Sequence, residues 1–281
     1  MRFKKALTYT IPVLLFIILF SGSVRSDIYI PTSLEATYST PVSAIETPPP
    51  ETTTTTTAST TASVTTTSPT TVTTSPAATT PPTFNGQPSP RDAEYESQLA
   101  FVGDSVCMGL KVYGGLLSPD QVFAQGSVSA RTIYDYTFSY KGQALSIIDC
   151  IRLSAPKYIY IWMGINDINI TEADVYAKNL EALANNFLAV SPESKIAIVS
   201  MTPTTTSHRW QANGRINDYN AYVKNYFAGL DNTKFYYIDV HSALVNSAGA
   251  LPDNLHSGDG LHLGTAAYQI VLGYISANKI K

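Results

Sequence analysis

The sequence predicts an α/β fold in three layers, α/β/α, with helices on both faces of a central parallel sheet. After Arg91, short apolar segments alternate with amphipathic helical segments, which is the order that β-α-β units with right-handed crossovers produce. Residues 157–163 are almost continuously apolar and aromatic, as expected for a strand covered on both faces. Polar motifs directly follow the predicted strands, and functional residues in such folds gather at the carboxyl ends of the strands.

The first half of this region supplies three predicted strands and three predicted helices. Apolar runs predict strands over 98–103, 121–124 and 157–163. Helical periodicity predicts helices over 105–113, 130–138 and 143–154. The first helix begins directly after the first strand, so the turn between them is short.

The second half continues the alternation of helices and strands. Thr171-Glu172-Ala173-Asp174 resembles a capping box that opens a helix, which we expect to end near Ser191. Apolar residues recur in it at helical spacing, at Val175, Leu180, Leu183, Ala184 and Phe187. Strands are predicted over 195–201 and 234–240, and helices over 216–227 and 265–277.

The first third of the chain differs in composition from the rest. Arg2, Lys4 and Lys5 precede an apolar run, so residues 1–26 are predicted to be a signal peptide or, if uncleaved, a membrane anchor. Residues 27–92 are rich in Thr, Ser, Pro and Ala and predict a disordered linker, either a spacer or a tail without a role. Residues 93–281 form the predicted catalytic domain, which we expect to be secreted or extracellular, with possible cell-wall association.

Composition excludes several classes of partner. The net charge of −3 and pI near 5.8 argue against nucleic acid, and we expect membrane contact only through an uncleaved N-terminal segment. Cys107 and Cys150 supply no paired-cysteine metal motif. One disulfide between them stays open, and we expect Cys107, in an apolar context, to be a buried free thiol. Without a zincin histidine pair or a phosphate-binding loop, the sequence predicts no metal and no cofactor.

Four short stretches contain the groups that acyl transfer by a serine nucleophile requires. They are Gly103-Asp104-Ser105, Gly126, Gly164-Ile165-Asn166-Asp167 and Asp259-Gly260-Leu261-His262. A serine hydroxyl needs a base to accept its proton, a carboxylate orients that base, and hydrogen-bond donors stabilise the oxyanion. Each stretch follows a predicted strand or precedes the last helix, so we expect them to share one site.

In order and spacing these stretches resemble the sequence blocks of the SGNH, or GDSL, hydrolase family of esterases and lipases, over residues 97–280. The resemblance implies a flavodoxin-like SGNH hydrolase fold and a catalytic triad of Ser105, Asp259 and His262. It also implies an oxyanion hole formed by the backbone amides of Ser105 and Gly126 and the side-chain amide of Asn166. The block around Gly126 departs from the family pattern because it lacks the usual second glycine.

A purely structural role is the alternative for each site residue. Ser105 lies at a strand-to-helix junction, where serine is a frequent N-cap, and Asn166 could be a turn residue. We expect Asp104 and Asp167 to stabilise their own loops. Of the other three histidines, His241 is expected to be a satisfied structural residue and His256 a solvated loop residue.

The loop after the fourth strand is a candidate substrate-binding segment. It contains Thr204, His208 and Trp210, and it follows a strand whose carboxyl end faces the predicted site. An aromatic ring and polar groups beside a pocket suit sugar recognition, although an exposed loop tryptophan is also an ordinary finding.

The sequence therefore predicts an exported serine esterase that removes short acyl groups, in particular acetyl, from a carbohydrate or cell-wall polymer through an acyl-enzyme. Lipase, lysophospholipase or thioesterase activity and O-acyl transfer remain open, because these reactions share one nucleophile. A non-catalytic surface-binding module is the alternative from another class.

Overall fold

The computed structural model describes residues 88–113 and 116–281. The predicted signal peptide or anchor and nearly all of the predicted linker lie outside these residues. None of the helices in the described part of the chain is both long enough and apolar enough to cross a membrane. Cys107 and Cys150 are both buried free thiols, which is the state expected for Cys107.

A five-stranded parallel sheet forms the centre of the domain, in the order β2-β1-β5-β6-β7. The strands are β1 (Leu99–Gly103), β2 (Val122–Ala124), β5 (Tyr158–Trp162), β6 (Lys195–Val199) and β7 (Phe235–Ile238). Every residue of β1 and β5 is buried, because both strands are central and covered on both faces. This confirms the predicted parallel sheet.

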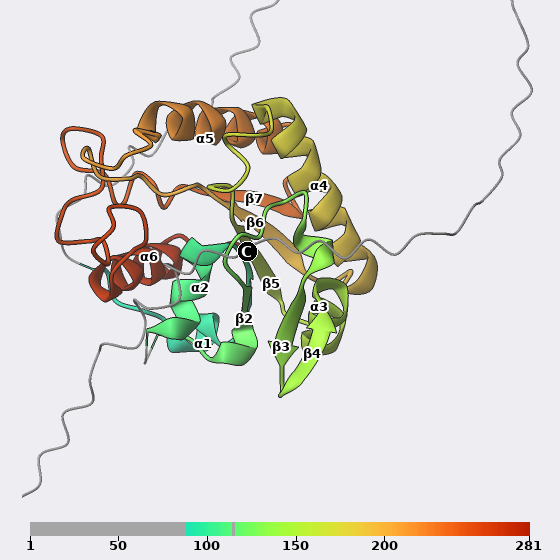
Figure 1. Ribbon diagram of the computed structural model, residues 1–281. Helices are drawn as coiled ribbons and strands as arrows, with labels where there is room; N and C mark the ends of the chain where they lie inside the picture. Colours follow the sequence, from blue (N-terminus) through green and yellow to red (C-terminus); the bar gives the residue numbers. More distant parts are fainter. Residues whose placement is uncertain (1–87, 114–115) are drawn as a thin grey trace, which may run out of the picture. The chain divides into compact units, whose positions relative to one another are not determined.

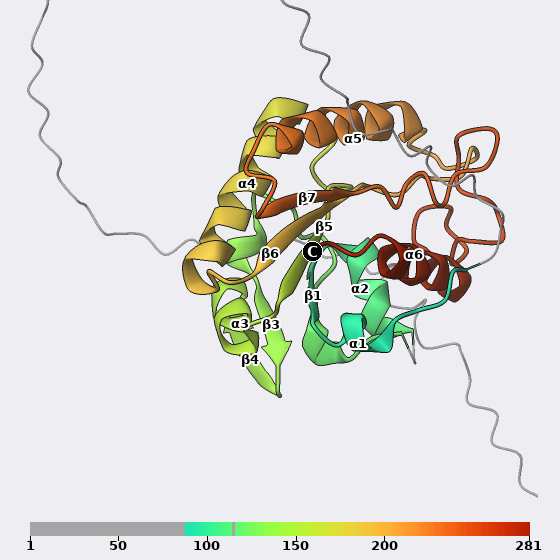
Figure 2. The same cartoon turned by 180° about the vertical axis from the view of Figure 1, so that it is seen from behind.

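Helices cover the two faces of the sheet in two groups (Figures 1 and 2). One group consists of α1 (Ala93–Glu96), α2 (Ser105–Val112) and α6 (Thr265–Ala277). The other consists of α3 (Ile147–Ser154), α4 (Ala173–Val190) and α5 (Asn213–Ala228), which pack against one another in sequence order. The predicted three-layer α/β/α architecture is thereby confirmed, and α6 joins α2 although the two helices are far apart in the sequence.

Strand order reverses at β1, because the chain moves to one side of β1 for β2 and to the other side for β5. In open α/β sheets such a reversal leaves a crevice at the carboxyl ends of the strands, where ligands bind. Ser105, Gly126 and Asn166 follow β1, β2 and β5 respectively. The topology thus places all three residues at this crevice.

The helix predicted over 130–138 is wrong, and the helix predicted over 143–154 begins too early. The chain instead forms the short 3₁₀ helix η4 (Ile133–Asp135) and an antiparallel hairpin of β3 (Thr137–Tyr140) and β4 (Gln143–Ser146). Lys141 and Gly142 both have positive φ, 48° and 77°, which is the geometry of a tight two-residue hairpin turn. Helix α3 starts only after Ser146, whose hydroxyl accepts the amide hydrogen of Asp149.

The capping box predicted at the start of α4 is also wrong. The helix begins at Ala173, and its N-cap is Glu172, which makes no side-chain cap hydrogen bond. Thr171 is buried, and its carbonyl accepts the Tyr219 hydroxyl at 2.5 Å, so tertiary packing fixes this start. Val175 is 45% exposed and is not part of the buried face, whereas the other four predicted positions are buried.

Candidate active site

Three polar side chains at the crevice form a continuous hydrogen-bonded series. His262 Nε2 lies 2.9 Å from Ser105 Oγ, and His262 Nδ1 lies 2.5 Å from Asp259 Oδ2. With Nδ1–H donating to the carboxylate, Nε2 is available to accept the proton of the serine hydroxyl. Ser105 and His262 are 157 positions apart in the chain, so only the fold brings them together.

Ser105 is the first residue of α2, and the residue that caps this helix is Asp104. The Asp104 carboxylate accepts the amide hydrogen of Val106 at 2.9 Å and thereby performs the role that Ser105 might have had as an N-cap. The Ser105 hydroxyl is instead directed to His262. Its own backbone amide lies in the first turn of the helix, where amides have no acceptor within the helix and the helix dipole favours negative charge.

Asp259 and His262 are held together by the turn between them. Asp259 Oδ1 accepts the backbone amides of Leu261 and His262, both at 2.9 Å, while Oδ2 faces the imidazole. Gly260 has a φ of 78°, and a Cβ atom at this position would lie 2.4 Å from Thr205 Oγ1. Glycine is therefore required here both by the backbone conformation and by the close approach of Thr205.

The surroundings keep Asp259 ionised. Burial raises the pKa of this carboxyl, but the hydrogen bond with the His262 side chain and the two backbone amides outweigh burial and hold the pKa below its ordinary value. A carboxylate that stays charged stabilises the imidazolium that forms when His262 accepts a proton.

Asn166 follows β5 and contacts the loop that carries Gly126. Its Nδ2 donates to the carbonyl of Val128 at 2.8 Å, which uses one of the two amide hydrogens. The other amide hydrogen can serve as a donor to an oxyanion. Gly126 is exposed, and apart from Gly126 itself and its two chain neighbours no residue has an atom within 4 Å of where its Cβ would be.

Two buried carboxylates connect the loops that carry the predicted nucleophile and oxyanion donors. Asp104 Oδ2 accepts the amide hydrogen of Gly164 at 3.0 Å and so joins the start of α2 to the loop after β5. Asp167 Oδ2 accepts the amide hydrogen of Ala130 at 3.1 Å and joins that loop to the segment after β2. Burial raises the pKa of each carboxyl to about 6, although the backbone amides lower it in part.

Asn166→Ala tests the predicted oxyanion donor. We expect kcat for an aryl acetate to fall by about 100- to 1000-fold with a smaller change in KM, because a donor to the oxyanion acts mainly in the transition state. Steady-state kinetics of the full-length protein measure this. Asn169→Ala, three positions later on an exposed stretch, is the matched control. A kcat for Asn166→Ala within threefold of wild type would contradict the assignment.

Asp167→Asn tests how much the burial of the second carboxylate lowers the free energy of unfolding when that carboxylate is charged. Because its pKa in the folded protein is about 6 and the ordinary value is 3.8, the folded state binds more protons between these pH values. The free energy of unfolding therefore falls as pH rises through this window, by on the order of 2 kcal/mol from this group. The variant should lose that part of the pH dependence in urea unfolding at pH 4.5 and 7.5.

Asp174→Asn is the control for this measurement, because Asp174 is an exposed carboxylate of α4 that pairs with Lys178. It should retain the wild-type difference in the free energy of unfolding between pH 7.5 and 4.5. Because the pKa of Asp104 is also raised to about 6, part of this difference should remain in Asp167→Asn. If Asp167→Asn retained all of it, Asp167 would not contribute to the pH dependence.

A hollow of about 420 Å³ lies beside His262 and Asp259. The predicted substrate-binding residues His208 and Trp210 both line it, with their rings in edge contact at 5.1 Å between centroids. Trp210 is 43% exposed, and the Arg209 guanidinium lies 5.4 Å from the centre of its ring. Burial lowers the pKa of His208, and its Nδ1 is buried without a partner among the described residues.

Thr204 does not line this hollow, which corrects the expectation that it binds substrate. It is fully buried, and its hydroxyl and backbone amide both donate to the Asn213 side chain, at 3.1 and 2.8 Å. Asn213 also donates back to the Thr204 carbonyl at 2.8 Å. Thr204 therefore anchors the loop to the start of α5.

Among the described residues, neither of the remaining two histidines is hydrogen-bonded to the Ser105 hydroxyl. His256 lines the hollow, and its Nδ1 accepts the amides of Gly258 and Gly260 at 2.8 and 3.2 Å, so it stabilises the loop that precedes His262. His241 was expected to be satisfied, but its Nε2 is buried without a partner in the part of the chain that the structure describes. No group of three or more metal-ligating side chains occurs among these described residues.

Sequence reasoning missed the links that the two buried carboxylates make and the role of Tyr268. The Tyr268 hydroxyl donates to the Val106 carbonyl at 2.6 Å, which fastens α6 to the first turn of α2. A Cβ atom on Gly109 would lie 2.0 Å from the Tyr268 hydroxyl, so Gly109 makes this contact possible. A glycine within an apolar helix was the available signal, because such a glycine often marks a close approach.

Comparison with solved structures finds proteins that resemble this chain in fold. A protein structure from Streptococcus pneumonia named for platelet activating factor is 18% identical, with a TM-score of 0.51, over 66% of this chain and 89% of that one. A Bacteroides fragilis structure named as an acylhydrolase is 18% identical over 68% and 89%, with a TM-score of 0.48. A carbohydrate esterase family 3 structure from Talaromyces cellulolyticus is 16% identical over 64% and 94%, with a TM-score of 0.46.

A search of curated proteins finds no match. The Streptococcus pneumonia structure supports the fold alone, because its sequence identity to this chain is only 18%. The model of the GDSL-like Lipase/Acylhydrolase family matches residues 101–270, a segment that begins within β1, ends within α6 and contains all four sequence motifs. The chain therefore belongs to the GDSL-like lipase/acylhydrolase family, as the sequence motifs predicted.

Proposed function

We propose that this enzyme is an exported serine esterase that removes acetyl or other short acyl groups from a carbohydrate or cell-wall polymer. The observation that carries the proposal is the hydrogen-bonded series of Ser105, His262 and Asp259 at the carboxyl edge of the sheet. Family membership supports ester hydrolysis as the reaction class. The acyl group, the polymer and export are our inference from the site and the sequence.

In this mechanism the Ser105 hydroxyl attacks the ester carbonyl while His262 Nε2 accepts its proton. The negative charge on the carbonyl oxygen is stabilised by the amides of Ser105 and Gly126 and by the Asn166 side chain. His262 then donates its proton to the leaving alcohol, and the acyl group remains on Ser105. A water molecule, deprotonated by His262, releases the acyl group in the second half of the reaction.

Solvent access favours hydrolysis over acyl transfer to a sugar. The side chains of His262 and Asp259 are 37% and 49% exposed. Water can therefore reach the acyl-enzyme from the side of the base. An acyltransferase would need to exclude water at this stage.

The sequence supports export and a polymeric substrate. The charged start and the apolar run that follows are typical of a secretory signal, and 27–92 would hold the catalytic domain at a distance from the membrane. The large hollow beside the base has room for a sugar unit, with an aromatic ring and polar groups on its walls.

A hydrolysis screen tests this proposal. Full-length protein should release acetate from acetylated sugars or acetylated cell-wall polymer faster than it hydrolyses octanoate and longer esters. Preference for long-chain esters or phospholipids would replace the proposal with a lipase function. No turnover of any ester would favour a binding module.

Trp210→Ala tests whether the hollow binds the alcohol part of the substrate. We expect KM for an acetylated sugar to rise by about 10-fold, because a stacked aromatic ring contributes on the order of 1 kcal/mol or more. Hydrolysis of p-nitrophenyl acetate should continue. Tyr222→Ala removes an exposed aromatic ring on α5 that does not line the hollow and is the control. Equal KM values for Trp210→Ala and wild type on all substrates would contradict this role.

A further inference from the structure

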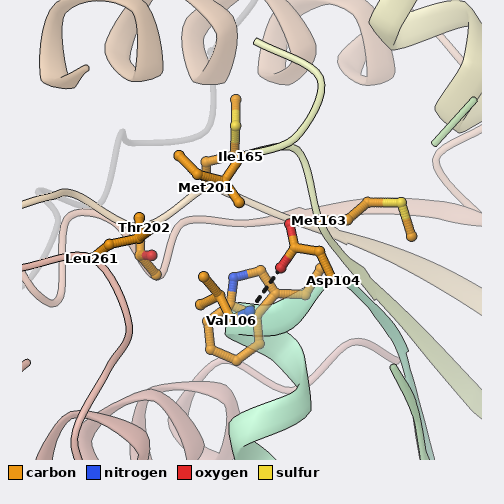
Figure 3. Close-up of a pocket in the computed structure, with 8 residues that line it drawn as sticks. Asp104, Val106, Met163, Ile165, Met201, Thr202 and Leu261 are labelled. Atoms are coloured by element: carbon orange, nitrogen blue, oxygen red, sulfur yellow. Dashed lines mark hydrogen bonds between the residues drawn. The ribbon is translucent and has the colours of Figure 1, made fainter. Parts of the chain in front are cut away.

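A second, much smaller cavity lies on the core side of the same site. Its lining consists of Asp104, Val106, Trp162, Met163, Ile165, Met201, Thr202 and Leu261. Figure 3 shows Met201 and Ile165 on one side of this cavity and Val106 on the other, with Leu261 and Thr202 at a third side. Most of these side chains are apolar, which makes the cavity unsuited to an alcohol or sugar.

The cavity is adjacent to the reacting groups along the chain. Asp104 and Val106 flank Ser105, Ile165 precedes Asn166, and Leu261 precedes His262. These neighbours are buried, whereas Ser105, Asn166 and His262 are each partly exposed. The reacting groups therefore lie towards solvent, and four of the residues that line the cavity are their buried neighbours along the chain.

The two hollows differ in whether they are lined by His262, the base. Leu261 lines both, so they adjoin at this residue. The large hollow is lined by His262, which must donate a proton to the leaving alcohol. The alcohol therefore belongs in the large hollow, and the acyl carbon chain, on the other side of the carbonyl, has the small cavity available to it.

The backbone of Met201, whose side chain forms part of the cavity wall, is held in place by α5. The Asn220 side chain of α5 accepts the Met201 amide at 2.8 Å and donates to the Met201 carbonyl at 2.9 Å. Gly164 has a φ of 137°, and a Cβ atom there would lie 2.6 Å from the Met201 sulfur. The Met201 side chain thus packs against the loop that carries Asn166, and its backbone position does not depend on its side chain.

The cavity has little free space. The volume open to the centre of a water-sized sphere is about 10 Å³, compared with about 420 Å³ in the large hollow. The small cavity thus has far less free space than the large hollow, and a methyl group fits it more readily than a chain of several methylene groups.

We propose that this cavity is the acyl site and that Met201 and Ile165 close it, so that the enzyme accepts acetyl esters and rejects longer acyl chains. The proposal rests on the proposed esterase function and adds the residues that set acyl length. The methyl group of the acyl chain enters between Val106 and Met201 while its carbonyl carbon lies at Ser105 Oγ. A longer chain would collide with the Met201 and Ile165 side chains.

The test compares acyl-length profiles of full-length wild type and Met201→Ala on p-nitrophenyl acetate, butyrate and hexanoate. We expect the ratio of kcat/KM for butyrate to that for acetate to rise by about 10-fold or more in Met201→Ala, since one methylene in an apolar pocket changes discrimination by about 10- to 200-fold. Ile165→Val, a smaller truncation that preserves folding more readily, should raise the same ratio to a smaller extent.

Leu180→Ala is the control, because Leu180 is a buried residue of α4 outside the cavity lining. It should leave the ratio unchanged although it removes a similar side chain. An unchanged ratio in both Met201→Ala and Ile165→Val, or a wild type that hydrolyses hexanoate as well as acetate, would overturn the acyl-site proposal and leave the esterase function intact. Absence of ester hydrolysis by wild type would instead overturn the proposed function.

Discussion

Ser105→Ala is expected to lower kcat for p-nitrophenyl acetate by on the order of 10⁵-fold or more, because no other described hydroxyl is hydrogen-bonded to the His262 imidazole. Steady-state kinetics of the full-length protein measure the loss. The double variant Ser105→Ala/His262→Ala should be no slower than either single variant, because the two groups act as a unit. Additive losses would contradict a shared role.

This variant should fold normally, which makes its kinetic effect interpretable. Asp104 keeps the helix cap, and alanine is favourable at the first position inside α2. We therefore expect the melting temperature to stay within a few degrees of wild type. Ser154→Ala, in the last turn of α3, is the control and should retain full activity. If wild type and Ser105→Ala were equally inert on every acyl length, the domain would be a binding module.

The parallel sheet could be predicted because its central strands have a strong local signal. The β5 residues are apolar or aromatic throughout and are all buried, so burial on both faces is visible in the sequence itself. The motifs at the strand ends made the site predictable for a similar reason. Each contains a residue type that acyl transfer needs, at a place where the fold class gathers functional groups.

The hairpin was missed because its signal competes with helical periodicity. Phe138 is buried and Ser139 is exposed, which is strand alternation, but four residues are too few to exclude a helix. The turn at Lys141 and Gly142 was the better signal, since a glycine between alternating segments is typical of tight hairpins.

The buried links and the acyl cavity depend on tertiary structure. Asp104 and Gly164 are 60 positions apart, and no local pattern relates a carboxylate to an amide at that distance. The wall position of Met201 likewise depends on Asn220, a residue of α5 that carries no recognisable motif. Sequence patterns identify the groups that react, whereas the groups that position them become visible only in the folded chain.

Asp259→Asn is expected to lower kcat by about 10³- to 10⁴-fold, and the structure indicates how. The backbone amides of Leu261 and His262 both donate to Oδ1, so the oxygen of an asparagine side chain would occupy that position. Its NH₂ group would then face His262 Nδ1 and donate to it. The imidazole would carry its hydrogen on Nε2 and could not accept the proton of Ser105.

Asp259→Asn also separates two roles of the carboxylate, which are to orient the His262 imidazole and to supply a negative charge beside it. Because the turn keeps its two backbone hydrogen bonds, His262 should remain near Ser105, and KM for p-nitrophenyl acetate should change much less than kcat. The ¹⁵N chemical shifts of the imidazole measure the tautomer directly and should show the hydrogen moving from Nδ1 to Nε2. Asp253→Asn, an exposed carboxylate of the preceding loop, is the control and should change neither quantity. If Asp259→Asn kept the wild-type tautomer and kcat, the carboxylate would only stabilise the turn, and the base would work without it.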